Sequence, residues 1–298
     1  MMGEIYLYGM ILATESILLC GDYPKPDDYA EIRERYDLIG GETGIAAAIL
    51  SSFGCDVTLG GSHLGYRNSA IILDYFKNKS VDTSKLAMED GFSGVMDCVI
   101  IDKDTRTCFG QFGALFDRKI PFYEAPDEEE IKKCSVVGAD PFFGEQIAEL
   151  CVSHHKKYAT IDCNYDSIMN RYCAVNAISH QHLKAIYPGQ DYLELYRKYT
   201  ENTDGLIIFT FGEKEIMYGR KGEEPKYFKP YAVDVVSTLG AGDSFKAGTI
   251  YGLYNGMDDD ELVRFACGTA AGSCANYPIP LKTVTLEMVE SIMNGTSK

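Results

Sequence analysis

Apolar and polar positions alternate with two different periods along most of the chain. Short runs rich in β-branched and aromatic residues, such as Leu206–Phe211, predict buried strands, and longer stretches with apolar residues three or four positions apart, such as Glu145–His155, predict helices. The other predicted strands are Glu4–Ile11, Asp56–Leu59, Ser135–Gly138 and Tyr158–Asp162, and the other predicted helices are Gly44–Phe53, Asn68–Asn78, Asp127–Lys133 and Asp191–Tyr199. This alternation indicates βαβ units, so we expect an α/β fold with a mostly parallel central sheet between helices.

Two stretches break the alternation. Glu15–Asp37 is extended and interrupted by a proline-rich loop, and Gly94–Phe112 contains two β-rich runs around a polar turn, which predicts a hairpin. Both stretches look antiparallel and lie far apart in sequence, so we expect them to pair into a small sheet that covers one edge of the main domain. No linker or internal repeat is evident, and residues 1–298 are predicted to form a single domain with small-sheet segments at about 13–39 and 92–113.

The charge of the chain limits its partners. It has 28 Lys and Arg against 44 Asp and Glu, a net charge of −16, which argues against a nucleic-acid partner because phosphate backbones need a basic face. The first apolar stretch contains Glu4 and lacks a basic leader, and no apolar run approaches the roughly 20 residues of a membrane span. We therefore expect a soluble, cytoplasmic protein without a membrane partner.

The metal-binding residue types show no site pattern. The ten cysteines include no C-x-x-C pair, and the five histidines have no metal-ligand spacing, so no protein-held metal site is predicted. The cysteines lie in apolar stretches and are expected to be reduced core thiols. Cys98 and Cys108 flank the predicted hairpin turn, which leaves a disulfide between them as a minor alternative.

The most informative segment is Val233–Tyr254. Its three valines favour a strand, the glycines of Gly240-Ala241-Gly242 favour a tight turn, and the following residues favour a helix that ends near Asn255-Gly256. The N–H groups at a helix N-terminus attract anions, phosphate in particular. Asp243 would lie at this positive end, where a carboxylate can deprotonate an attacking hydroxyl. An ordinary helix start with a dipole-compensating acid is the alternative interpretation.

The same segment resembles the signature of the ribokinase-like carbohydrate kinases, also called the PfkB family. Their D-T-x-G-A-G-D-x-F run is matched by Ser237–Phe245 at all but its first position. A glycine pair that opens a helix in the N-terminal third is matched by Gly40-Gly41, and a T-x-G element after a strand is matched by Thr210-Phe211-Gly212. Order and spacing agree, and the resemblance covers essentially the whole chain.

The resemblance implies an ATP-dependent kinase that phosphorylates a hydroxymethyl group of a sugar or sugar derivative. It implies that the small sheet is a lid over the sugar. It also implies that Asp243 is the general base and that the N–H groups of Gly240, Ala241 and Gly242 form the anion hole. Mg²⁺ would bridge the ATP phosphates mainly through water. The predicted nucleotide-binding residues are Thr210, Gly212, Thr238 and Asn276, and the predicted substrate-binding residues are Gly40, Gly41, Glu42 and Glu15. A homodimer through the lid is a further expectation.

The chain also departs from the family pattern. Ser237 replaces the first acid of the signature, which leaves dependence on a monovalent cation open. In many members a sugar-binding Asp lies five residues after an early glycine; counting from Gly9, this position is occupied by Thr14, and Glu15 follows it. The family's N-x-x-E element is missing where it is expected, and the candidate replacements are Asp191, Glu194, Asn164 and Asp166. Lys246, directly after the signature Phe245, is interpreted as a solvated helix lysine, with a contact to a phosphate as the alternative. The alternatives are therefore a kinase for a nucleoside of the pseudouridine type, a kinase for a fructosamine-type adduct, and a non-catalytic sugar sensor.

Overall fold

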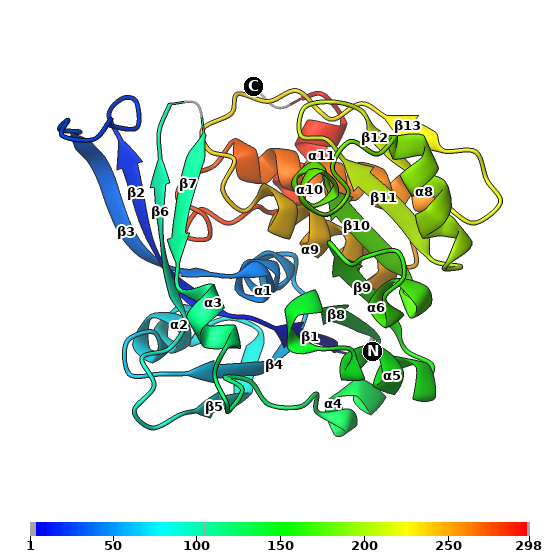
Figure 1. The fold of residues 1–298 in the computed structure, drawn as a ribbon, viewed down its shortest axis with the longest axis horizontal. Coiled ribbons are helices and arrows are strands. Elements are labelled where there is room, and N and C mark those ends of the chain that lie inside the picture. The colour runs from blue at the N-terminus through cyan, green and yellow to red at the C-terminus, as the bar shows by residue number, and fades with distance from the viewer. Residues whose placement is uncertain (1–3, 104, 297–298) are drawn as a thin grey trace.

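The fold is built on one large sheet with helices on both sides (Figure 1). The computed structural model describes residues 4–103 and 105–296. Within these residues the large sheet has nine strands in the order β13-β12-β11-β10-β9-β8-β1-β4-β5, and only the β11–β12 and β12–β13 pairs are antiparallel. The strands are β1 (Ile5–Gly9), β4 (Val57–Leu64), β5 (Val81–Met88), β8 (Val136–Ala139), β9 (Lys157–Ile161), β10 (Val175–Ser179), β11 (Leu206–Thr210), β12 (Ile216–Gly219) and β13 (Lys226–Phe228). The predicted fold class is confirmed.

The central strand β1 shows how the two faces of the sheet are covered. Its side chains alternate, so Ile5 and Leu7 enter one apolar cluster and Tyr6 and Tyr8 enter another. The first face is covered by α1 (Glu42–Ser52), α2 (Ser69–Phe76), α9 (Ala241–Tyr254), α10 (Asp259–Cys274) and α11 (Leu286–Met293). The other face is covered by α4 (Glu128–Lys133), α5 (Gln146–Ser153), α6 (Ile168–Tyr172), α7 (His180–Ile186) and α8 (Tyr192–Glu201).

A second sheet stands beside the first, at the left of Figure 1. Its strands are β2 (Leu12–Leu19), β3 (Ile32–Gly40), β6 (Met96–Ile101) and β7 (Arg106–Gly110), in the order β3-β2-β6-β7. The pairs β2–β3 and β6–β7 are antiparallel, and a parallel ladder between β2 and β6 joins them. The two irregular stretches of the sequence therefore meet as expected. We call this four-stranded unit the small sheet.

The strand predicted at the valines before the glycine turn is wrong. No strand forms over residues 233–236, and Val235 and Val236 are 60% and 52% exposed. The N–H groups of Val236 and Ser237 donate instead to the carbonyl of Cys274, at the end of α10. The backbone here thus pairs with the end of α10 and not with a strand. β-branched residues favour an extended conformation, but a strand also needs a neighbouring strand as hydrogen-bond partner.

Two glycines explain how α9 lies against α10. A Cβ added at Gly248 would be 2.5 Å from the Cα atom of Ala266, and one added at Gly252 would be 2.8 Å from Leu262. The predicted helix end near Asn255 is confirmed, since Asn255 is the C-cap of α9. The close approach fixes α9, and with it the signature acid, against the core.

Among the residues described, the cysteine side chains are not joined in disulfides. Each of the ten cysteines is free, so the minor alternative of a Cys98–Cys108 disulfide is wrong. Within the described part of the chain, no helix is both long and apolar enough to cross a membrane. The remaining short elements are α3 (Phe112–Phe116) and a 3₁₀ turn at Pro141–Phe143.

Candidate active site

A cavity of about 210 Å³ lies where the small sheet faces the start of α9. Its polar lining residues are Thr14, Asp97, Arg106 and Asp243, and its apolar lining includes Leu12, Leu38, Ile39, Ile45, Val99 and Leu239. Gly40, Gly41 and Gly240 also line it. The cavity thus brings together both glycine motifs, the signature acid and both stretches of the small sheet.

The floor of the cavity is the N-terminus of α9. Gly240 is the N-cap residue with φ 74°, a left-handed conformation that favours glycine. The first α-helical bond runs from the N–H of Ser244 to the carbonyl of Gly240, at 2.8 Å, so the N–H groups of Gly242 and Asp243 precede the helical ladder. α9 has 14 residues, and its dipole places partial positive charge at this end. The turn can therefore stabilise an anion beside Asp243.

Asp243 is surrounded by charges that shift its protonation. Burial raises the pKa of its carboxyl to about 6, and the Arg106 guanidinium opposes this rise. Three further carboxylates, those of Asp140, Asp162 and Asp97, add smaller contributions that raise the pKa. A carboxylate with a pKa nearer to neutrality is a better general base, because it holds a transferred proton more strongly while remaining ionised at pH 7.

Arg106 connects the small sheet to the signature. It is the first residue of β7, and its Nη1 atom donates a hydrogen bond of 3.0 Å to Thr238 Oγ1. Arg106 was not predicted as a site residue, because no local sequence motif marks it. Its position is set by the β6–β7 pairing, in which Arg106 lies opposite Ile101.

The register of the small sheet decides which acid faces the cavity. Thr14 is paired with Leu38 on one side and with Asp97 on the other, so the three side chains share one face. Glu15 follows Thr14 and points to the opposite face, where it forms an ion pair with Arg35. The structure thus places Thr14 and Asp97 in the cavity, and Glu15 is not among the residues that line it.

Asp97 has an unsatisfied carboxylate oxygen. Its Oδ1 atom is buried and has no hydrogen-bond partner within the described structure. Burial raises the pKa of the Asp97 carboxyl, and a hydrogen bond with the side chain of Thr14 opposes this shift. Leaving a buried polar atom without a hydrogen bond costs about 1–3 kcal/mol, and more when the group is charged, so a ligand that donates a hydrogen bond to Asp97 would remove this cost. Sequence counting from Gly9 missed this residue.

The glycine pair forms another wall of the cavity. Gly41 has φ 77°, and a Cβ atom there would lie 2.6 Å from the carbonyl oxygen of Met10. Only glycine therefore allows the chain to pass between this carbonyl and the cavity. Gly40 and Gly41 lie beside the same cavity as Asp243, and their role in substrate binding stays a prediction.

Glu42 and Lys246 lie behind the cavity. The interpretation of Lys246 as a solvated lysine is wrong, because the residue is 1% exposed. Its Nζ atom donates to the carbonyl of Ala139 at 2.9 Å and forms an ion pair with Glu42. Burial lowers the pKa of the Lys246 amine, and the Glu42 carboxylate beside it favours the charged form. Glu42, predicted to bind substrate, is 9% exposed and is not among the residues that line the cavity.

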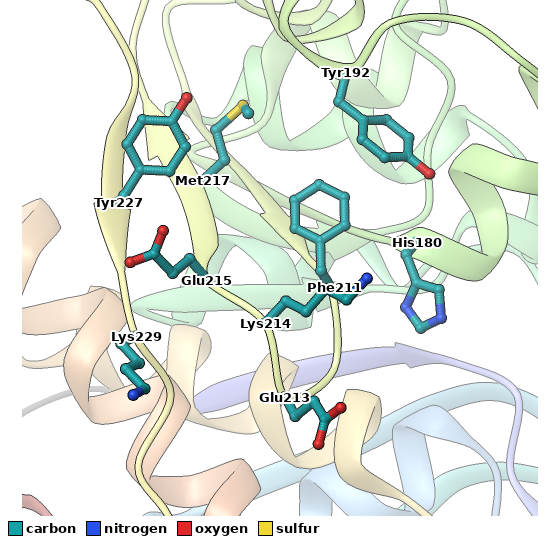
Figure 2. A pocket seen from close by; sticks show the side chains of 9 residues that line it. All are labelled: His180, Tyr192, Phe211, Glu213, Lys214, Glu215, Met217, Tyr227 and Lys229. Atoms are coloured by element: carbon teal, nitrogen blue, oxygen red, sulfur yellow. The ribbon is translucent and has the colours of Figure 1, made fainter.

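A second cavity, of about 760 Å³, lies beside the predicted T-x-G element (Figure 2). Thr210 ends β11, and the next residues contribute Phe211, Glu213 and Lys214 to the lining. Figure 2 shows that the cavity also receives side chains from α7, α8, β12 and the β13 region, and its lining residues there are His180, Tyr192, Glu215, Met217, Tyr227 and Lys229. Gly212 lies within the lining turn. Rings here can stack on a planar base.

Two predicted nucleotide residues have other contacts. The side-chain amide of Asn276 donates to the sulfur of Met288, at 3.7 Å, and Asn276 lines neither cavity described above. Thr238 accepts the hydrogen bond from Arg106. A nucleotide role for either residue stays a prediction.

Two of the four candidates for the missing N-x-x-E element, Asp191 and Asn164, are already hydrogen-bonded. Asp191 is the N-cap of α8 and accepts from the N–H groups of Leu193 and Glu194. Asn164 is hydrogen-bonded to His182, at 3.1 Å. Among the residues that the structure describes, no three His, Cys, Asp or Glu side chains are grouped as metal ligands. A cation here would take most of its ligands from phosphate and water.

Comparison with solved structures shows which proteins share this fold. A putative ribokinase from Agrobacterium tumefaciens superposes with a TM-score of 0.85 at 18% identity, over 98% of both chains. Arabidopsis thaliana ribokinase, solved with ribose and ATP, gives 0.80 at 16% identity over 98% of this chain and 99% of that one. A nucleoside kinase from Methanocaldococcus jannaschii gives 0.74 at 16% identity, over 99% of both chains. Sugar kinases and nucleoside kinases thus share this architecture.

Sequence comparison gives the family. A curated ribokinase from Haemophilus influenzae is 33% identical over 88 residues, a segment that spans 28% of this chain and only 28% of that enzyme. The model of the pfkB family carbohydrate kinases matches residues 22–277, which include the glycine pair, strands β3, β6 and β7 of the small sheet, the T-x-G element and the signature. The chain therefore belongs to the pfkB family of carbohydrate kinases, which are phosphotransferases with an alcohol group as acceptor.

Proposed function

We propose that the protein is an ATP-dependent kinase that phosphorylates a hydroxymethyl group of a sugar or sugar derivative. The observation that carries this proposal is the position of Asp243 and the Gly240 turn at the floor of a cavity lined by the small sheet. The volume of about 210 Å³ favours a compact acceptor such as a monosaccharide.

In the proposed reaction, the acceptor hydroxyl lies against the Asp243 carboxylate, which takes its proton as the hydroxyl oxygen attacks the terminal phosphoryl group. The N–H groups of Gly240, Ala241 and Gly242 stabilise the negative charge that develops on the transferred group, and the dipole of α9 adds to this effect. The products are the phosphorylated acceptor and ADP, and the proton leaves from Asp243 to water.

The larger cavity is proposed to hold ATP. Its volume of about 760 Å³, its aromatic rings and the amines of Lys214 and Lys229 fit a base and an anionic tail. A bound Mg²⁺ ion would neutralise charge on the phosphates. Because the described residues have no three-ligand cluster, this ion would be held by the nucleotide and water.

The small sheet is proposed to act as a lid, over segments of about 13–39 and 92–113. In support, its inner face supplies Thr14, Asp97 and Arg106 to the cavity, and Arg106 reaches Thr238 of the signature. A lid in this position would exclude water from Asp243 and so limit wasteful hydrolysis of ATP.

Asp97 and Thr14 are proposed to bind acceptor hydroxyls in place of Glu15. An ionised carboxylate only accepts hydrogen bonds, and Asp97 Oδ1 has none within the described structure, so a sugar with two neighbouring hydroxyls would satisfy it. The apolar walls supplied by Leu12, Leu38 and Val99 would contact the carbon-bearing face of the sugar.

The test measures ADP release with Mg²⁺ and ATP across a panel of sugars, polyols, sugar acids, nucleosides including pseudouridine, and a fructosamine. We expect one class of acceptor to stimulate turnover. Asp243→Asn should lower kcat by at least roughly 10²-fold while the KM for ATP is retained. Asp234→Asn, a change at an exposed acid of the preceding loop, is the matched control and should leave kcat unchanged.

The same panel separates the alternatives. The aliphatic walls of the cavity favour a nucleoside as second candidate, because a base could pack against them. Stimulation by nucleosides alone would replace the sugar assignment. Binding of a sugar without any ADP release, in protein that also binds ATP, would contradict the kinase proposal and indicate a sensor.

A further inference from the structure

We infer that Glu42 and Lys246 form a positioning pair that holds the glycine wall of the acceptor cavity in a fixed relation to Asp243. The inference rests on the proposed function, since it assigns the pair a role in that reaction. Neither residue lines the cavity, yet Glu42 directly follows Gly40-Gly41 and Lys246 lies one helical turn after Asp243.

The pair joins three elements. Glu42 is the first residue of α1 and Lys246 belongs to the first half of α9, so their ion pair connects the two helix starts that face the cavity. The Lys246 ammonium group also donates a hydrogen bond of 2.9 Å to the carbonyl of Ala139. Ala139 is the last residue of β8. One side chain thus ties α1, α9 and the carboxyl edge of the large sheet.

The burial of the pair argues against a purely stabilising purpose. The side chains of Lys246 and Glu42 are only 2% and 9% exposed. Removing two charges from water is strongly unfavourable, and apolar replacements of a buried pair are often neutral or stabilising. The charged pair is therefore better explained by the fixed geometry that it imposes than by a gain in stability.

The geometry matters because catalysis is sensitive to small displacements. The acceptor would rest against Gly40 and Gly41, which lie at the start of α1, while its proton acceptor belongs to α9. A shift of about 1 Å between a reacting group and its substrate can lower a rate by roughly 10²-fold. A direct bridge between the two helix starts would prevent such a shift.

The experiment compares Glu42→Gln, Lys246→Met and the double variant. Each single change leaves one buried group without its partner and should lower both stability and kcat. The double variant carries no unpaired charge, so its melting temperature should return toward the wild-type value, whereas its kcat should remain lower by roughly 10²-fold. The KM for ATP should stay unchanged in all three variants, because the larger cavity lies elsewhere.

A matched control uses another ion pair away from both cavities. Arg220 contacts Asp259 at 2.7 Å, and neither residue lines a cavity described above. The double variant Arg220→Met with Asp259→Asn should alter stability without lowering kcat. In addition, Lys246→Arg keeps the charge and should retain more activity than Lys246→Met.

Hydrogen exchange provides a readout that does not need turnover. In the Glu42→Gln, Lys246→Met double variant, amides near Gly41–Ile45 and Gly240–Ser244 should exchange faster, while those of the large sheet keep their protection. A double variant with normal kcat, or with unchanged exchange at both helix starts, would overturn the inference. An absence of turnover in the wild-type protein would instead count against the proposed function, and the exchange measurement would still decide the role of the pair.

Discussion

Asp243 shows how neighbouring side chains set the chemistry of one residue. Burial and three carboxylates raise the pKa of its carboxyl, and the guanidinium of Arg106 opposes this rise. Because Arg106 belongs to the small sheet, the protonation of the proposed base depends on the position of that sheet. The pKa of Asp243 is therefore expected to report the position of the small sheet.

The pH dependence of turnover follows from these shifts. Burial raises the pKa of Asp243 from 3.8 to about 6, so the carboxyl becomes protonated as the pH falls through 6 and can no longer accept a proton. We expect kcat/KM for the acceptor to fall below about pH 6. Arg106→Met should move this acidic limb to higher pH, because it removes the charge that opposes the rise. Arg33→Met, at an exposed lid arginine, should not move it.

Asp97 gives a second test at the scale of a residue. Asp97→Asn keeps the shape but removes the charged acceptor, and hydrogen bonds to charged groups contribute about 1.5–3 kcal/mol. We therefore expect the KM for the acceptor to rise by roughly 10-fold or more, with the KM for ATP unchanged. Asp37→Asn, at an exposed acid of β3, is the matched lid control. Equal kinetics of the two variants would remove Asp97 from the acceptor site.

At the scale of an element, α9 carries the site and depends on its contact with α10. The contact is close because Gly248 and Gly252 have no side chains where α10 passes. Glycine lowers helix stability by roughly 1 kcal/mol relative to alanine, so these positions sacrifice local stability for packing. The packing in turn fixes the direction in which the N-terminus of α9 points.

Gly248→Ala tests this packing. Its new Cβ would lie 2.5 Å from a backbone atom of Ala266, so the helices must separate. Overpacking typically lowers stability by about 1–3 kcal/mol, which should outweigh the gain in helix propensity of about 1 kcal/mol. Gly113→Ala in α3, where nothing lies within 4 Å of the added Cβ, should be neutral or stabilising. Urea unfolding of both variants measures the difference, and an equally stable Gly248→Ala protein would contradict the argument.

The elements also show what the sequence could predict. The turn at Gly240, the helix after it and the glycine pair were predictable because their causes are local: a left-handed residue, a helix cap and a periodic apolar face. Asp97 and Arg106 were not, because strand register places them in the cavity and register is a property of two strands. The burial of Lys246 depends on how α9 is rotated against α1, which no local pattern encodes.

At the scale of the whole molecule, the negative net charge of the chain opposes the approach of its proposed cosubstrate. The chain has a net charge of −16, and its proposed cosubstrate is an anion. Within the cavities, positive potential comes from helix dipole and N–H groups at α9 and from a few side chains such as Arg106 and Lys214. The anionic cosubstrate is therefore attracted within the cavities, whereas the net charge of the chain repels it at longer range.

This contrast predicts an unusual salt dependence. The Debye length shortens from about 30 Å at 0.01 M salt to about 8 Å at 0.15 M, which screens long-range repulsion more than contacts within a cavity. We expect kcat/KM for Mg-ATP to rise severalfold over this range, with kcat/KM for a neutral acceptor nearly constant. A decrease with salt would show that the local lysines dominate the encounter with the nucleotide.

The order of the strands has a consequence for the newly synthesised chain. The small sheet is complete at Gly110, whereas α9 begins only at Ala241. A domain generally folds as a unit, and its N-terminal residues are synthesised first. The wall that would bind the acceptor is thus translated before the proposed base and anion hole, and its apolar residues Leu12, Leu38 and Val99 lack the packing of the complete domain during this interval. Chaperone binding during translation is therefore expected to concentrate on this interval, before α9 docks and closes the cavity.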